Sequence, residues 1–411
     1  MRVAVVGAGV AGISAAWHLD RGGAQVRLIE QGTRLGGHTH THEIGVQNGS
    51  VSIDTGFIVF NEHNYAEFCR WLHHLGVDSQ PSIMSFAVRD DIDALEYGTT
   101  DLRSIVANSS QLVRPAYWSL WRDVIRFYRR LHEGAIPDTT LGEYLAGDGY
   151  GNAFVQSHIV PMCAALWSQP ADESLRLSLR HVIEFMRNHK MLQLVERPAW
   201  RVIKGGSSAY LRAFEARFSG QIVTDAPITE ITREGIGVGI RHGGSHERFD
   251  AVVLACHSDQ ALSILGDATT LEQNVLGAMS YQNNAVYLHS DASFMPRNKA
   301  CWSSWNVIRG RDGAYTITYW MNLLQGLTCS EQFFVTLNPT SEPHQISWQG
   351  SYEHPHFTKA SYAAQQKWTE ISRGPLQFAG AYWGSGFHED GFVSGQRCAR
   401  AVLDMVSCDA A

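Results

Sequence analysis

The stretch Arg2-Val3-Ala4-Val5-Val6-Gly7-Ala8-Gly9-Val10-Ala11-Gly12, at the start of the 411-residue chain, decides the fold. Its first five residues form an apolar, valine-rich run that is typical of a buried parallel strand. The glycines follow at once with the spacing GxGxxG, and an apolar helical segment comes next. Gly7 permits a tight turn, Gly9 lets a pyrophosphate approach the backbone, and Gly12 lets the helix pack on the strand. The pattern predicts a nucleotide-binding strand–turn–helix unit.

A carboxylate at the end of the next predicted strand completes the dinucleotide pattern. The strand reads Val26-Arg27-Leu28-Ile29-Glu30, and Glu30 comes 18 positions after Gly12, close to the expected spacing. Its oxygens can accept hydrogen bonds from ribose hydroxyls, while its charge would repel the 2′-phosphate of NADP. The helix N-terminus offers free N–H groups and a positive dipole to phosphates. We therefore expect an α/β fold with a Rossmann-like domain that holds NAD or FAD.

Three further segments resemble the signature of one flavoprotein superfamily. Arg34-Leu35-Gly36-Gly37-His38 is similar to the RxGGR motif of the flavin amine oxidase and phytoene desaturase superfamily, with His38 in place of the second arginine. Asp54-Thr55-Gly56 resembles the segment that runs along the isoalloxazine ring, and Phe378 to Gly391 resembles the C-terminal flavin motif. The resemblance implies FAD as the cofactor and an amine-oxidase type of fold.

The glycine turn and the resemblance together give a set of expected cofactor contacts. Ile228 matches the residue whose backbone meets the adenine, and Glu389 or Asp390 is expected to replace the acid that the superfamily carries where this chain has Ala381. The expected FAD contacts are Gly7, Gly9, Gly12, Glu30, Arg34, Gly36, Gly37, His38, Thr55, Gly56, Ile228, Gly380, Glu389 and Gly391.

Longer stretches resemble a narrower group of flavoproteins. Residues 36–41, 54–61, 352–355 and 380–391 are similar to the bacterial FAD-dependent proteins associated with cyclopropane and methyl fatty-acid synthesis. They also resemble the flavoprotein domain fused ahead of plant cyclopropane fatty acid synthases. This resemblance implies a fatty-acyl substrate, unsaturated or methyl-branched and esterified in phospholipid, and a fatty-acid methyltransferase as partner.

The order of the motifs predicts a discontinuous domain, because 411 residues exceed what one core usually holds. We expect residues 1–56, 201–264 and 371–411 to form the FAD-binding domain. Residues 57–200 and 265–370 are expected to form an interleaved α+β substrate-binding domain, helical in the first part and rich in strands in the second.

Local patterns predict individual elements within these segments. Residues 65–75 carry apolar side chains at helical spacing. Residues 222–231 and 249–255 are expected to be strands of the nucleotide domain, and 315–320 and 333–337 strands of the substrate domain.

The C-terminal motif supplies the candidate catalytic residues. Tyr382 and Trp383 are expected, by the resemblance, to face the flavin ring, and their alternative interpretation is as core aromatics. His388 could accept a proton beside flavin N5, because the reference pKa of histidine, about 6.5, suits both protonation states. Its alternative role is to anchor the backbone.

Two other patterns bear on the chemistry. His38, His40 and His42 alternate along the chain, but no carboxylate or cysteine partner is evident, and we expect no metal. Many amine oxidases of the superfamily place a lysine that holds a water on flavin N5. Lys299 is the best placed of the five lysines by chain order, but its neighbours 296–298 read as a polar turn. This weakens the amine-oxidase interpretation.

Charge and hydropathy limit the partners. Lys and Arg total 33 against 40 Asp and Glu, a net charge of −7 that argues against nucleic acid. No apolar run could span a membrane and no leader is seen, which predicts a cytoplasmic protein. Residues 112–131, however, combine five arginines and interleaved aromatics with one acid. Such a helix suits the anionic inner face of a membrane, and the alternative is a substrate-domain helix with solvated arginines.

The sequence leaves four functions open. The leading hypothesis is an FAD-dependent oxidoreductase that moves hydride from an acyl chain to flavin N5, next to a double bond or methyl branch, with the electron acceptor unspecified. The alternatives are amine oxidation, fatty-acid double-bond isomerisation, and a lipid-binding flavoprotein that serves a methyltransferase without turnover.

Overall fold

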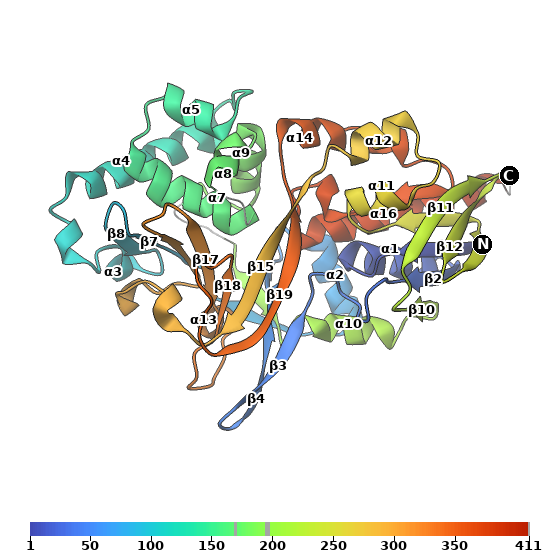
Figure 1. Ribbon diagram of the computed structural model, residues 1–411, viewed down its shortest axis with the longest axis horizontal. Coiled ribbons are helices and arrows are strands. Elements are labelled where there is room, and N and C mark those ends of the chain that lie inside the picture. Colours follow the sequence, from blue (N-terminus) through green and yellow to red (C-terminus); the bar gives the residue numbers. More distant parts are fainter. Residues whose placement is uncertain (168–170, 194–197, 410–411) are drawn as a thin grey trace.

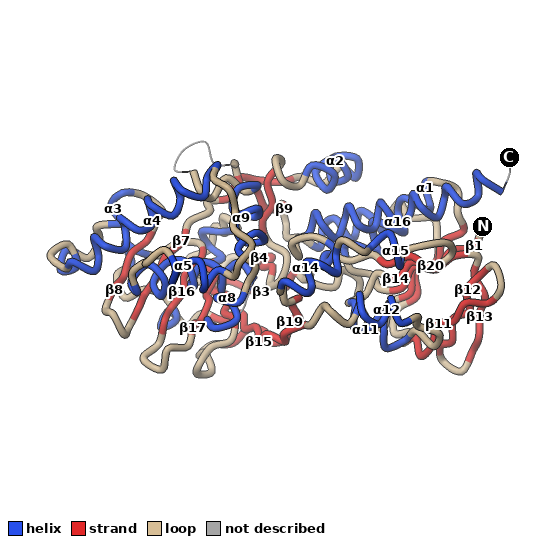
Figure 2. The backbone as a smooth tube through the Cα atoms, turned by 90° about the horizontal axis from the view of Figure 1, so that it is seen from above, coloured by secondary structure: helices blue, strands red, loops and turns tan. Residues whose placement is uncertain are grey.

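The computed structural model describes residues 1–167, 171–193 and 198–409 (Figure 1). Both termini lie at one end of an elongated molecule, and α3 (Leu102–Ile105) and α4 (Pro115–Glu133) lie at the opposite end (Figures 1 and 2). No helix in the described ranges has the length and apolar character that a membrane crossing requires.

A five-stranded sheet near the termini has the order β10-β2-β1-β14-β20, and all neighbouring strands are parallel. Its strands are β10 (Gln221–Val223), β2 (Gln25–Ile29), β1 (Arg2–Val6), β14 (Ala251–Leu254) and β20 (Leu376–Phe378). Both faces of β1 carry apolar side chains, and each face packs into a hydrophobic cluster. Val3 and Val5 pack in the cluster that contains α1 (Val10–Arg21) and α16 (His388–Asp409), whereas Ala4 and Val6 face the opposite cluster.

A three-stranded antiparallel sheet of β11 (Ile228–Glu234), β12 (Gly237–His242) and β13 (Ser245–Phe249) covers that opposite face. The predicted single strand over 222–231 is therefore wrong, since it divides into β10 and β11. Asp225 between them has a φ of 52°, and its N–H donates to the carbonyl of Gly32 over 2.8 Å. Pro227 has no N–H for a ladder, so the chain turns here.

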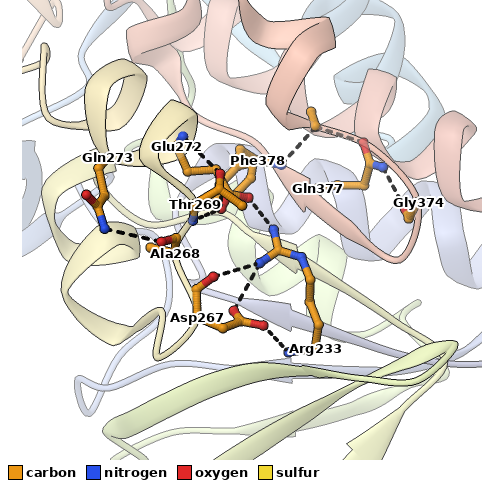
Figure 3. Close-up of polar contacts among 10 residues, drawn as sticks. Arg233, Asp267, Ala268, Thr269, Glu272, Gln273, Gly374, Gln377 and Phe378 are labelled. Atoms are coloured by element: carbon orange, nitrogen blue, oxygen red, sulfur yellow. Dashed lines mark hydrogen bonds and ion pairs between the residues drawn. The ribbon is translucent and has the colours of Figure 1, made fainter.

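Arg233 ties this small sheet to α12 (Thr270–Leu276), as Figure 3 shows. Its guanidinium lies 3.0 Å from Asp267 and also bonds Glu272. Thr269 and Glu272 cap the helix reciprocally, through Thr269 N–H to Glu272 over 2.8 Å and Glu272 N–H to the Thr269 hydroxyl over 3.2 Å.

The second half of the molecule is built on a seven-stranded sheet of order β19-β15-β18-β17-β16-β7-β8. Its strands are β19 (Ile346–Pro355), β15 (Tyr281–His289), β18 (Phe334–Leu337), β17 (Tyr315–Trp320), β16 (Trp305–Arg309), β7 (Phe86–Asp90) and β8 (Leu95–Gly98). The long antiparallel pair β15 and β19 runs from this sheet toward the nucleotide end (Figure 1).

A helical layer packs against that sheet around a separate hydrophobic cluster. It contains α4, α5 (Leu141–Gly147), α6 (Asn152–Phe154), α7 (Val160–Trp167), α8 (Ala171–Arg176) and α9 (Leu179–Asn188). The remaining elements that position the site are β3 (Thr41–Val46), β4 (Gly49–Asp54), β5 (Val59–Asn61), α2 (Ala66–Leu75), β6 (Ser79–Ser82), β9 (Trp200–Ile203), α10 (Ser208–Glu215), α11 (Ser258–Ile264), α13 (Met321–Leu324), α14 (Lys359–Gln365) and α15 (Trp368–Ile371).

The parallel sheet takes its strands from three separate stretches of sequence. They come from residues 1–56, 201–264 and 371–411, the segments expected to form one domain. β9 pairs instead with β5 and β6, so the chain crosses between the two halves around residue 200. The exact domain boundaries stay a prediction.

Candidate cofactor and active site

The carboxyl ends of the parallel strands meet at one edge, the place where open α/β sheets bind ligands. Short backbone bonds hold the chain there: Gly7 N–H donates to Ile29 over 2.8 Å, and Ala255 N–H donates to Val6 over 2.7 Å. The turn after β1 and Glu30 after β2 therefore lie side by side. Ala379, whose N–H donates to the Leu254 carbonyl over 2.8 Å, lies beyond β14 at the same edge.

The three glycines of the first turn differ in their surroundings. A Cβ atom at Gly7, whose φ is 96°, would lie 2.8 Å from the Ala255 carbonyl oxygen, and one at Gly12 would lie 1.8 Å from that of Gly7. At Gly9 a Cβ would meet no atom within 4 Å. Gly9 thus faces open space at the start of α1, whose first turn has no side-chain cap and no acid. Its N–H groups are free to bind phosphate.

A second glycine loop lies opposite the first. Gly36 and Gly37 have φ values of 107° and 56°, and a Cβ at Gly37 would lie 3.2 Å from the Gly9 Cα. The Arg34 guanidinium fixes this loop by donating to the carbonyls of Gly37 over 2.7 Å and Thr39 over 3.0 Å. A direct contact between Arg34 and FAD stays a prediction.

Glu30 lies where the adenosine half of a dinucleotide is expected. Its carboxylate accepts from Ala8 N–H over 2.7 Å and from Gly32 N–H over 2.9 Å, one bond to each oxygen. Each oxygen keeps acceptor capacity for a ribose hydroxyl. Ala226 N–H donates to the Glu30 carbonyl over 3.0 Å, and so brings Ile228, at the start of β11, close to this carboxylate.

The two helices at this edge lie side by side because glycines remove side chains between them. A Cβ at Gly391 would lie 2.7 Å from the Val10 side chain, and one at Gly395 would lie 2.1 Å from the Ala11 carbonyl oxygen. Both glycines belong to α16, and their lack of side chains lets the N-terminal parts of α1 and α16 pack closely. Gly380 lies just before this junction, where its N–H donates to the Ser394 hydroxyl over 3.0 Å.

His388, a predicted catalytic residue, is held on both sides. Its ring stacks on Phe57 with centroids 3.6 Å apart, and its Nε2 lies 3.0 Å from the Tyr210 hydroxyl, which in turn lies 2.6 Å from the Thr39 hydroxyl. Burial lowers the pKa of His388 to about 3. A neutral, anchored imidazole favours the anchoring role, and proton transfer by His388 stays a prediction.

Tyr382 and Trp383 lie at the junction of two hydrophobic clusters. The Tyr382 ring is buried among residues of the cluster beneath the small sheet, while Trp383 contacts both clusters. Neither the Tyr382 hydroxyl nor the Trp383 Nε1 has a hydrogen-bond partner among the described residues. The surroundings of Tyr382 favour its interpretation as a core aromatic, and a contact of either ring with the flavin stays a prediction.

The two acidic residues that follow His388 accept hydrogen bonds from backbone N–H groups. Glu389 accepts from Glu67 N–H over 2.9 Å and from Phe68 N–H over 3.0 Å, at the start of α2. Asp390 accepts from N–H groups of the loop 385–387, and burial raises its pKa to about 6. This gives Glu389 a structural task that the sequence did not suggest, and its expected contact with FAD stays a prediction.

Three aromatic side chains that were not predicted as site residues surround His38. Tyr352, His354 and His257 have ring centroids 5.1, 5.2 and 6.2 Å from that of His38. Burial lowers the pKa of His354 to about 4 and that of His38 well below 6.5. Two signals pointed here: residues 352–355 form one of the stretches that carry the resemblance, and His257 follows β14 at the binding edge.

His40 and His42 continue this neutral surface along β3. Their rings lie 4.0 Å apart, and burial lowers the pKa of each to about 4. His42 Nε2 lies 3.0 Å from the Thr55 hydroxyl, which lies 2.8 Å from that of Tyr352. No group of three or more His, Cys, Asp or Glu in the described ranges is placed to hold a metal ion.

Asp54 is a buried hub just before the segment 55–56. It accepts from the Thr41 hydroxyl over 2.5 Å, from Ser207 N–H over 2.9 Å and from the Gln325 amide over 2.8 Å. Burial nevertheless raises its pKa to about 6. Asp54 thereby fixes β4, the start of α10 and α13 relative to one another.

Lys299 lies away from this edge. Its ammonium is 5.6 Å from the Trp302 ring, and the neighbouring Asn298 donates to the carbonyl of Ala107 over 3.0 Å, beside α3. The helix beside it, α3, lies at the far end of the molecule from the nucleotide-binding sheet (Figure 1).

The residues present fit FAD. Gly9 leaves open backbone where a pyrophosphate would pass, and it lies at the N-terminus of α1, which has no side-chain cap. Glu30 has acceptors left for ribose. His38 Nε2, on the second glycine loop, is a buried polar atom without a partner among the described residues, as expected where a polar cofactor completes the site.

The sequence model of the family described as flavin containing amine oxidoreductase matches residues 10–341. The chain belongs to this family. It is a flavin-dependent oxidoreductase that uses FAD, and the expected amine-oxidase type of fold is confirmed.

Solved structures share this fold over the whole chain. Cyclohexylamine oxidase from Brevibacterium oxydans IH-35A has a TM-score of 0.72 at 16% identity, covering 99% of both chains. The CLA-producing fatty acid isomerase from P. acnes has a TM-score of 0.67 at 16% identity, covering 99% of this chain and 98% of its own.

A curated relative matches over a short stretch. The flavin-dependent L-tryptophan oxidase RebO of Lentzea aerocolonigenes is 48% identical over 50 residues, which are 12% of this chain and 10% of that protein. The match thus spans about a tenth of the relative's length.

Proposed function

We propose that this flavoprotein oxidises a fatty-acyl chain, esterified in phospholipid and carrying a double bond or methyl branch. Bound FAD supplies a hydride acceptor at N5, and the protein must orient a C–H bond there and exclude water. A C–H bond next to a double bond is the better hydride donor, because the resulting cation is delocalised.

The observation that carries this proposal is an aromatic band beside the N-terminus of α16. Phe387, the residue before His388, stacks on Phe185 of α9 with centroids 4.5 Å apart, and Phe185 stacks on His189 at 3.9 Å. Burial lowers the pKa of His189 to about 4, so its ring is neutral near pH 7. Phe185 belongs to the buried core, whereas Phe387 and His189 are half-buried, so an apolar chain would run over these two rings.

The nearby charges support the same substrate class. The carboxylates of Glu389 and Asp390, on the first turn of α16, are engaged by backbone N–H groups. The lysine expected of an amine oxidase by chain order, Lys299, lies beside α3 instead. A cationic amine would therefore compete with backbone N–H groups for these two carboxylates, whereas an alkyl chain needs no such partner.

Amine oxidation is the second candidate, because it is the chemistry for which the family is described. Isomerisation is the third, and a fatty acid isomerase of the same fold supports it. In the fourth the protein binds lipid and serves a fatty-acid methyltransferase without turnover of its own.

Anaerobic mixing separates these functions. Unsaturated or methyl-branched phospholipid is expected to bleach the flavin absorbance near 450 nm, with loss of two hydrogens from the acyl chain by mass spectrometry. Bleaching by amines but not by lipids would overturn the proposal in favour of amine oxidation. A shifted double bond without net loss of hydrogen would indicate isomerisation, and an unchanged lipid extract would indicate the non-catalytic partner.

A further inference from the structure

The end of the molecule formed by residues 101–130 carries a positive, partly apolar surface. It holds six arginines and two aspartates, and Arg130 pairs with Asp148 over 3.1 Å, which leaves a local charge of +3 in a chain of net charge −7. The buried face of α4 carries Tyr117, Phe127 and Tyr128, so most of the aromatic residues that suggested a membrane helix belong to the core. The exposed side chains of this surface therefore decide what it can bind.

Large apolar side chains stand exposed among these arginines. Leu102 is 81% exposed, Val113 84% and Trp118 56%, and Val106 and Ile125 are also exposed. Arg122 is exposed over 72% of its side chain, and Arg103, Arg114 and Arg129 are exposed as well. Leucine, valine and tryptophan at such exposure are unusual for a surface that faces only water.

Hydrogen bonds join these residues into one surface. The Trp118 indole donates to the carbonyl of Leu112 over 2.8 Å, which brings Trp118 against Val113. The Tyr117 hydroxyl donates to the carbonyl of Ile105, so the end of α3 lies beside the start of α4. Arg114 donates to the carbonyls of Asp93 and Ala94 in the β7–β8 turn, beside the exposed Ile92.

We infer that this surface docks the protein on an anionic lipid bilayer. Arginines attract acidic headgroups, and the apolar side chains between them can enter the interface. A symmetric dimer through the same face would bring two positively charged surfaces together. A nucleic acid would satisfy the arginines but not Leu102 or Val113. The surface lies at the end opposite the termini in Figures 1 and 2.

The test is vesicle co-sedimentation of the full-length, FAD-loaded protein. Vesicles of phosphatidylcholine with phosphatidylglycerol are expected to bind it, binding should weaken as salt rises, and phosphatidylcholine alone should bind little. Arg122→Gln with Arg129→Gln should weaken binding about 25-fold, since each arginine contributes about fivefold. Leu102→Ser with Val113→Ser should weaken it roughly tenfold or more.

The matched control exchanges the same kinds of residue elsewhere. Ile236→Ser, at a position 91% exposed between β11 and β12, with Arg212→Gln on α10, should bind like the wild type. FAD absorbance reports that each variant is folded. Absence of binding by the wild type, equal loss in the control, or a wild-type dimer that the patch variants dissociate would each overturn the inference. Vesicle binding needs no turnover, so this outcome is independent of which substrate the flavin oxidises.

Discussion

Gly9 differs from the other two glycines of its turn because no atom of the described residues lies within 4 Å of the place where its Cβ would be. Gly9→Leu should therefore fold, since the φ of Gly9 is −71° and a Cβ there meets no atom within 4 Å. The leucine side chain would occupy the pyrophosphate path, so FAD affinity should fall roughly a hundredfold or more. Fluorescence titration of the apoprotein with FAD measures this loss.

The matched control is Gly147→Leu, because Gly147 also has open space at its Cβ position but lies on α5. It should bind FAD like the wild type. Unchanged FAD affinity in folded Gly9→Leu would place the pyrophosphate elsewhere.

Asp54 shows how one buried carboxylate holds several elements. Asp54→Asn removes an acceptor oxygen and turns an amide N–H₂ toward donors such as Ser207 N–H and the Gln325 amide. Leaving buried donors unpaired should lower the free energy of unfolding by about 2–4 kcal/mol, measured by urea denaturation. Glu43 is exposed and accepts from the Ser52 hydroxyl across a surface hairpin, so Glu43→Gln should change it by less than about 0.5 kcal/mol. Equal effects would contradict the hub role.

At the scale of elements, the N-terminus of α2 is capped by Glu389, a residue more than 300 positions away in sequence. Glu389→Gln weakens two charge-assisted bonds to Glu67 and Phe68 N–H and should cost about 1 kcal/mol of stability while FAD is retained. Thermal unfolding and the flavin-to-protein absorbance ratio measure both effects. Thr269→Ala, which removes the local cap of α12, is the comparison with a similar cost. Loss of FAD from Glu389→Gln alone would instead support the cofactor contact.

The sequence predicts elements well where the causes are local. β1, the glycine turn, α1 and β2 follow from valine runs and glycine spacing, and α2 follows from apolar periodicity. The break between β10 and β11 depends on Asp225 bonding Gly32 near the end of β2, which no local pattern announces. The close packing of α16 on α1, through Gly391 and Gly395, likewise depends on residues remote in sequence.

The candidate site likewise has a part that could be predicted from the sequence and a part that could not. The phosphate-binding part could be predicted because turn, strand and carboxylate are near neighbours in sequence. His257, Tyr352 and His354 reach His38 only through the folding of β14 and β19, so they were missed. The role of His388 depends on contacts with Phe57 and Tyr210 that are equally remote.

The whole molecule should be sensitive to acid because many histidines are buried in the neutral form. Burial lowers the pKa to about 4 for His40, His42, His181, His189, His289 and His354, and to about 3 for His388. The unfolded chain binds these protons near pH 6.5, so stability is present above that pH and is lost as the pH falls toward 4.

Two buried acids act in the opposite direction. The raised pKa values of Asp54 and Asp390, about 6, mean that the stability they contribute is present below pH 4 and lost as the pH rises through 6. Seven histidines outweigh two acids, so the thermal midpoint should fall steeply from pH 7 to pH 5. His181→Phe, which keeps a ring against Phe357, should flatten this dependence. A midpoint unchanged or higher at pH 5 would contradict neutral burial.

The account centres on hydride removal from an acyl chain at FAD, and the rate of anaerobic flavin reduction tests it most directly. Phospholipid with deuterated acyl chains is compared with the unlabelled lipid, and headgroup-deuterated lipid is the control. We predict that flavin bleaching slows severalfold with deuterated chains and is unchanged with deuterated headgroups. No bleaching by any unsaturated or methyl-branched lipid, or equal rates with deuterated and unlabelled chains, would contradict the account.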